Sequence, residues 1–167
     1  MRLFLRVIPR LMIAAALAAG SAGARAASVK VKVNAKVTKP LVLSVRQDLD
    51  FGQIVVPGTA GTRIVSISQS GVRACDAGLT CSGVARQAIF NVSGSNGQVA
   101  RISTATSILS NGTGGTIMFT PSAPASVTFT NSGSAGQNFG VGGSIPLSAT
   151  TSDGIYSGTV EVTVEYQ

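Results

Sequence analysis

Two stretches of the chain alternate strictly between apolar and polar residues. The first spans residues 29–38, and its apolar parity consists of Val29, Val31, Val33, Ala35 and Val37. The second spans residues 160–166, and its apolar parity consists of Val160, Val162, Val164 and Tyr166. Successive side chains of a β-strand point to opposite faces, so a period of two predicts two amphipathic strands. Each strand is expected to pack its apolar face on a core.

Shorter runs of the same kind occupy the chain between these two stretches. Strands are expected at about residues 41–46, 63–68, 86–92, 98–104, 115–120, 125–131 and 143–149. Glycine-rich turns separate them, and no helical repeat occurs beyond residue 26. Short strands at this spacing are typical of a sandwich, which needs about 100 residues. The sequence therefore predicts one all-β domain, an antiparallel β-sandwich.

The first 26 residues have the three parts of an export signal. The positive residues are Arg2, Arg6 and Arg10. An apolar run at residues 11–19 follows, and Ala24-Arg25-Ala26 forms an A-x-A cleavage site. The apolar run is shorter than the roughly 20 residues that span a bilayer. We expect a cleaved signal peptide at 1–26 and an exported mature chain with no stable membrane insertion.

Removal of the signal peptide changes the charge of the protein. The full chain has a formal net charge of +7, but Arg2, Arg6, Arg10 and Arg25 belong to the leader. Nine basic and six acidic residues remain, a net charge of +3. With few aromatic residues and no Trp, the chain offers no stacking platform for bases. Nucleic acid is not expected as a partner.

The inventory of catalytic groups is nearly empty. The chain has no His, which is the commonest general base and metal ligand, and no G-x-S-x-G motif. Asp48 and Asp50 would share a face of an extended segment, as carboxylate pairs of glycosidases and calcium sites do. They lie beside turn-forming residues without further oxygen ligands, so turn capping or a solvated face is the preferred interpretation. No enzymatic activity, metal or cofactor is expected.

Cys75 and Cys81 are the two cysteines of the chain. In an exported protein they are expected to form one disulfide. Closing so short a loop stabilises by roughly 2 kcal/mol in the chain-entropy model. The bond would fasten a local loop and would not cross-link two sheets.

The polar faces of the first and last strands carry opposite charges. Lys30, Lys32 and Lys36 lie on the first strand, and Glu161 and Glu165 lie on the last. Opposite charges paired across strands contribute roughly 0.2 to 1 kcal/mol each, which is enough to bias the register. Solubilising charges on edge strands explain the pattern equally well.

Two motifs resemble known families. Gly154, Tyr156 and the next-to-last Tyr166 frame alternating valines in a pattern that resembles the C-terminal signature of chaperone–usher pilus subunits. The Asp-Leu-Asp-Phe-Gly motif at residues 48–52, followed by Val-Pro-Gly, resembles a family of unknown function. Its members are secreted bacterial proteins related to fimbrial subunits and to spore coat protein U. The resemblance implies a pilin-like, immunoglobulin-like sandwich exported through the periplasm to the cell surface.

The resemblance also implies a function, that of a structural subunit of a surface fibre. Residues 27–39 would be the donor strand, with Val29, Val31, Val33, Ala35 and Val37 filling a groove in the next subunit. Residues 40–167 would be the sandwich domain that carries this acceptor groove. The groove would be bordered by Gly154, Tyr156, Val160, Val162, Val164 and Tyr166. The implied partners are copies of the chain or other pilin-like subunits, a periplasmic chaperone and an outer-membrane usher.

Burial of the donor strand would matter for stability. Its five apolar side chains would contribute on the order of 6 to 10 kcal/mol as an upper bound. Whole domains are stable by only about 5 to 15 kcal/mol. A domain deprived of this strand is therefore expected to be marginal.

Two other functions compete with the fibre subunit. A self-contained secreted or coat protein would fold its first strand onto its own sheet. The apolar parity of the first strand continues past Pro40 into Leu41, Leu43 and Val45, as it would in one long bent strand. An adhesin or sugar-binding module is disfavoured, because the chain has only six Phe and two Tyr.

Overall fold

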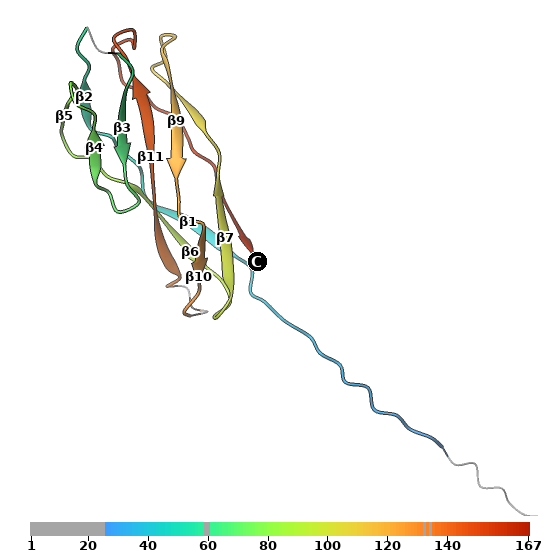
Figure 1. Ribbon diagram of the computed structural model, residues 1–167. Coiled ribbons are helices and arrows are strands. Elements are labelled where there is room, and N and C mark those ends of the chain that lie inside the picture. Colours follow the sequence, from blue (N-terminus) through green and yellow to red (C-terminus); the bar gives the residue numbers. More distant parts are fainter. Residues whose placement is uncertain (1–25, 59–60, 132, 134) are drawn as a thin grey trace, which may run out of the picture. The chain divides into compact units, whose positions relative to one another are not determined.

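The computed structural model describes residues 26–58, 61–131, 133 and 135–167. The chain divides into two units, Met1–Ala35 and Lys36–Gln167. The signal peptide predicted at 1–26 lies outside the described residues, apart from Ala26. The second unit is the folded domain, and Figure 1 shows it as a set of strands joined by short loops.

The described part of the domain contains twelve strands and no helix. The strands are β1 (Val42–Gln47), β2 (Gln53–Val55), β3 (Arg63–Ile67), β4 (Arg73–Cys75), β5 (Thr80–Ser82), β6 (Ala88–Ser93), β7 (Val99–Thr104), β8 (Ser107–Ser110), β9 (Thr116–Ser122), β10 (Ser126–Thr128), β11 (Gln137–Leu147) and β12 (Val162–Tyr166). Accordingly, no described segment is a helix of the length and hydrophobicity needed to cross a membrane.

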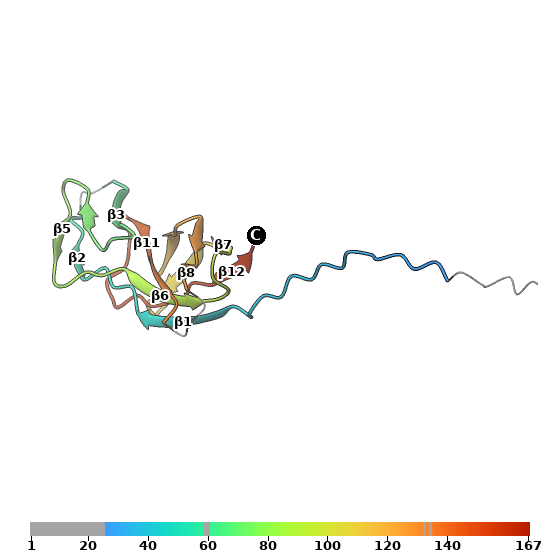
Figure 2. The ribbon, with the colours of Figure 1, turned by 90° about the horizontal axis from the view of Figure 1, so that it is seen from below.

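The strands form three antiparallel sheets. The largest has the order β1-β6-β11-β3-β4, with β9 joined to β11 and β8 joined to β9. A second sheet has the order β10-β7-β12, and β2 pairs with β5 in a third. Figure 2 shows β1 and β6 in one layer and β7 and β12 in the other. The all-β fold expected from the sequence is confirmed, as antiparallel sheets in a curled, sandwich-like arrangement.

Two hydrophobic cores fill the domain. The first consists of Ala88, Phe90, Val92, Ala100, Ile102, Phe129, Phe139 and Val141. The second consists of Phe51, Val65, Ile67, Ile117, Phe119, Ile145 and Leu147. Strand β11 contributes Phe139 and Val141 to the first core and Ile145 and Leu147 to the second. This strand therefore joins the two halves of the domain.

The extent of β11 differs from the sequence prediction. A strand was expected at about residues 143–149, whereas β11 begins at Gln137 because its glycines lie within the strand and not in a turn. A Cβ atom added to Gly140 would lie 2.0 Å from the carbonyl oxygen of Gln69. One added to Gly142 would lie 2.0 Å from that of Ile67. Both glycines thus permit backbone contacts that any side chain would block.

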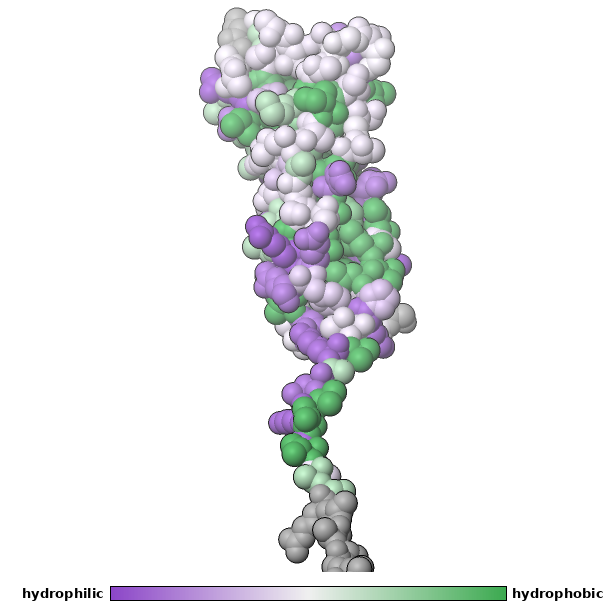
Figure 3. Space-filling model, turned by 90° about the vertical axis from the view of Figure 1, so that its right-hand side faces the viewer, coloured by the Kyte–Doolittle hydropathy of each residue, from purple (hydrophilic) through white to green (hydrophobic). Residues whose placement is uncertain are grey.

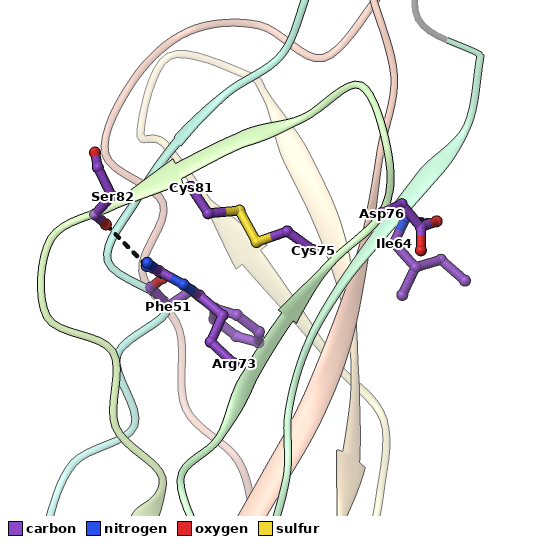
Figure 4. Close-up of a disulfide and its surroundings, with 7 residues drawn as sticks. All are labelled: Phe51, Ile64, Arg73, Cys75, Asp76, Cys81 and Ser82. Atoms are coloured by element: carbon purple, nitrogen blue, oxygen red, sulfur yellow. Dashed lines mark hydrogen bonds between the residues drawn. A yellow bond between two sulfur atoms is a disulfide. The ribbon is translucent and has the colours of Figure 1, made fainter.

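The disulfide predicted between Cys75 and Cys81 is confirmed and joins β4 to β5 (Figure 4). Beside it, the Arg73 guanidinium donates hydrogen bonds to the carbonyl oxygens of Phe51, at 2.9 Å, and Ser82, at 2.8 Å. Both half-cystines pack against the second core. The bond and the guanidinium together hold the small β2-β5 sheet on this core.

Candidate functional site

Asp50, one of the two candidate acidic residues, has a local structural role. Its Oδ1 accepts a hydrogen bond from the backbone N–H of Gly52 at 2.8 Å. Its Oδ2 lies 3.6 Å from Nη2 of Arg86, and both side chains are about half exposed. Gly52 has a φ of +74°, a conformation that favours glycine. Asp50 therefore caps the turn of the Asp-Phe-Gly motif, which agrees with the turn-capping role expected from the sequence.

The described residues hold no group of three or more His, Cys, Asp or Glu side chains placed to bind a metal ion. A shallow depression of about 230 Å³ lies over β7 and β12. Its lining consists of Ser103, Thr104, Ala105, Glu161 and Thr163. The more informative feature of this region is the edge of β12 itself.

Strand β12 has one hydrogen-bonded edge and one open edge. Among the described strands it pairs only with β7, where Glu165 lies opposite Arg101 and Thr163 opposite Ser103. The N–H of Gln167 bonds to the carbonyl oxygen of Val99 at 3.0 Å. Bonded and non-bonded pairs alternate in an antiparallel ladder, so odd-numbered residues of β12 bond to β7. The N–H and C=O groups of Val162 and Val164 therefore point to the open edge.

The apolar face of β12 is only partly covered. Val162, Val164 and Tyr166 pack against the first core, yet all three are only partly buried. Their register partners Ile102 and Ala100 on β7, opposite Val164 and Tyr166, are buried. The part of the first core that contacts β12 is therefore partly open to solvent.

Strand β1 borders the same core from the other sheet. It pairs only with β6 among the described strands, with Leu43 opposite Val92 and Val45 opposite Phe90. Val92 and Phe90 are buried in the first core, so Leu43 and Val45 share the inward face. Nevertheless, Val45 is 58% exposed. Sequence reasoning missed this second border, for which the only signal was the parity of Leu41, Leu43 and Val45.

Together, β1 and β12 are two edge strands whose inward apolar side chains are incompletely buried. We call the space between them the open edge of the first core, defined by Leu43, Val45, Val162 and Val164. The side of the molecule shown in Figure 3 carries a strip of hydrophobic side chains along the lower half of the domain, beside hydrophilic ones. An added amphipathic strand would cover apolar surface of this kind.

Tyr166 closes one end of this open edge. Its Oη accepts a hydrogen bond from the N–H of Ser95 and donates one to the carbonyl oxygen of Lys39, both at 2.8 Å. Its ring meets that of Phe129 edge to face, with ring centroids 6.1 Å apart. The hydroxyl thus fixes the residues that lead into β1 beside the end of β12.

We expect Tyr166→Phe to destabilise the domain by about 1 to 3 kcal/mol, since two hydrogen bonds lose their partner. Urea unfolding of the mature chain, made monomeric by the substitution Val33→Lys, measures this. Tyr156→Phe is the matched control, because its Oη donates a single hydrogen bond, to the exposed carbonyl oxygen of Ser152. An equal loss in both variants would contradict a special role for Tyr166.

The structure does not gather all of the predicted acceptor residues in one place. Tyr156 and Val160 pack against the second core, not the first. Gly154 has a φ of +142°, and a Cβ atom there would lie 3.1 Å from Cβ of Asn111. Gly154 and Tyr156 therefore serve the loop beside the second core. Of the predicted groove residues, Val162, Val164 and Tyr166 lie together along the first core.

The residues predicted as a donor strand are exposed. Val29, Val31, Val33 and Val37 are 80 to 91% exposed. No strand is assigned between residues 26 and 41, although the sequence predicts one at 29–37. A strand requires a partner for its backbone hydrogen bonds, and an alternating pattern does not say which chain provides it. The apolar face of this segment is available for packing.

These features define an antiparallel β-sandwich domain with two open edge strands. The chain belongs to the family described as Domain of unknown function (DUF4402), whose model matches residues 41–166. The predicted resemblance to a family of unknown function is thereby confirmed. The match begins after residue 40 and does not include the exposed segment. No curated protein and no solved structure matches the chain.

Proposed function

We propose that this protein is a structural subunit of a bacterial surface fibre. In this function, residues 29–37 of one copy add a strand at the open edge of the first core of the next copy. The fold is then a pilin-like, immunoglobulin-like sandwich, related to chaperone–usher subunits and to spore coat protein U. A periplasmic chaperone and an outer-membrane usher would carry the exported subunit to the cell surface.

One observation carries the proposal: the same chain has an exposed apolar strand sequence and an incompletely covered apolar edge. Val29, Val31 and Val33 expose their side chains to water. Val162 and Val164 direct to the open edge of β12 backbone groups that no described strand pairs with. Strand addition would bury the first set and supply hydrogen bonds to the second. The N-terminal segment needs a surface that covers its apolar side chains, and the open edge needs a strand that bonds to its backbone groups.

The mature chain tests the proposal directly. We expect it to form ladders that resist unheated detergent, and we expect a variant lacking residues 27–38 to form none. A synthetic peptide of residues 27–38 should raise the melting temperature of that variant. The peptide should also cap growth when added to the full chain. A full chain that stays monomeric, with a melt independent of concentration, would instead support the self-contained secreted or coat protein.

A further inference from the structure

The outward faces of the two strands have matching polar patterns. Glu161, directly before β12, and Glu165 within it flank Thr163, so that two acidic residues are separated by four positions. In the N-terminal segment, Lys32 and Lys36 flank Asn34 with the same separation. Among the described residues, no ion pair involves either glutamate. Both charged faces are therefore free to meet a partner.

In the register of β12 on β7, only one of the two glutamates lies opposite a basic residue. Glu165 lies opposite Arg101, but the same register continued by one residue places Glu161 opposite Ala105. A basic strand on the open edge would supply Glu161 with a cation that β7 does not provide. The charge pattern therefore favours a lysine-bearing occupant for this edge.

Few alignments of the two strands pair both glutamates with lysines. In an antiparallel arrangement, only one register does so, with Lys32 opposite Glu165 and Lys36 opposite Glu161. Sliding the strand by two residues in either direction leaves at most one such pair. In a parallel arrangement, the single matching register places Lys32 opposite Glu161 and Lys36 opposite Glu165. The spacing thus limits the choice to one register for each direction.

The direction of the added strand depends on which copy supplies it. Tyr166 Oη bonds to Lys39, so the residues leading into β1 lie beside the end of β12. A segment of the same chain that turned back between residues 38 and 41 would run parallel to β12. A second copy has no such constraint, and antiparallel pairs are slightly more stable per residue. All pairs of the described strands in this domain are also antiparallel.

We infer that the N-terminal segment of a second copy docks antiparallel to β12 in the register that pairs Lys32 with Glu165 and Lys36 with Glu161. This inference rests on the proposed function and specifies its contact. Val33 then lies opposite Val164 and Ala35 opposite Val162, with all four side chains toward the first core. Asn34 lies opposite Thr163 on the outer face.

Disulfide trapping in the full mature chain tests both register and direction. Odd-numbered residues of β12 bond to β7, so on the open edge they form non-hydrogen-bonded pairs with Cα atoms about 4.5 Å apart. That distance suits a disulfide. In heated detergent without reductant, a chain with Lys32→Cys and Glu165→Cys should run as a covalent ladder that reduction converts to monomer. Under the same conditions, the matched chain with Lys32→Cys and Glu161→Cys should run as a monomer.

The outcomes separate this inference from the proposed function. A ladder from the Lys32→Cys, Glu161→Cys chain would overturn the antiparallel register while leaving fibre formation intact. A monomer closed internally by that same pair would overturn both, because the strand would then dock on its own domain. Fibres that form without either cross-link would overturn the inferred register but not the proposed fibre function. No cross-link and no fibre would overturn both.

A charge exchange provides a second test without cysteines. Glu161→Lys should slow assembly of the full chain roughly tenfold, since one attractive cross-strand pair becomes repulsive. Adding Lys36→Glu should restore the rate in the inferred register. Adding Lys32→Glu instead should restore it only in the parallel register. Restoration by Lys32→Glu, or an unchanged rate in Glu161→Lys, would contradict the inference.

Discussion

Replacing Val33 by lysine is expected to abolish fibre assembly while leaving the domain folded. Val33 is 87% exposed in the isolated chain, so a lysine there is well solvated before docking. In the inferred register, the same side chain would face Val164 and the first core. Burial of an unpaired ammonium group costs several kcal/mol or more, enough to prevent docking. Sedimentation and unheated detergent gels measure assembly, and circular dichroism measures folding.

The neighbouring substitution Asn34→Lys is the matched control. It introduces the same residue one position along, where the side chain lies on the outer face between Glu161 and Glu165 of the partner. Assembly should persist or become faster. Equal assembly of the Val33→Lys and Asn34→Lys chains would show that the apolar face of residues 29–37 is not buried in the fibre.

Replacing Gly142 by alanine is expected to destabilise the domain by about 3 kcal/mol, at the upper end of the range for overpacking. The new Cβ atom would lie 2.0 Å from the carbonyl oxygen of Ile67 and 2.7 Å from the carbonyl carbon of Ser68. Both obstacles are backbone atoms, which cannot rotate aside as a flexible side chain does. Gly142 also lies in β11 between Val141, which packs in the first core, and Ile145, which packs in the second. Displacement of the strand at Gly142 would therefore disturb the packing of both cores.

Urea unfolding of the monomeric Val33→Lys background measures this effect without interference from assembly. Gly61→Ala is the control, because a Cβ atom at Gly61 meets nothing within 4 Å. Its free energy of unfolding should change by less than about 0.5 kcal/mol, as at most surface positions. A similar small change at Gly142 would mean that β3 and β11 can separate locally at little cost.

Alternation in the sequence predicted most of the longer strands, but the shortest strands were missed, and the alternating residues 29–37 form no strand within their own chain. Strands β7 and β12 were predicted because their apolar residues recur with a period of two. Strands β2, β4 and β5 have three residues each, too few for any period to show. The first half of β11 was missed because glycine is also the commonest residue of turns. The reason for glycine there is visible only in the tertiary structure, where the backbone of residues 67–69, at the end of β3, lies against Gly140 and Gly142.

The candidate site was predicted in part, for a similar reason. The valines of residues 29–37 and of β12 were identified from local pattern alone. The contacts of Tyr166 with Ser95 and Lys39 span 71 and 127 residues of sequence, and no local pattern encodes them. The open border formed by Leu43 and Val45 depends on which strands pair with β1. Such information lies in the tertiary structure.

The charges at the two free edges also bear on the symmetry of any assembly. Two copies of β12 paired edge to edge in the two-fold register centred on Thr163 would bring Glu161 of each copy opposite Glu165 of the other. Two N-terminal segments would likewise oppose Lys32 and Lys36 to lysines. Like charges directly opposite each other are destabilising, so a closed two-fold dimer is disfavoured at either edge. The charges would thus oppose pairing of either edge with the same edge of a second copy and favour head-to-tail, open-ended growth.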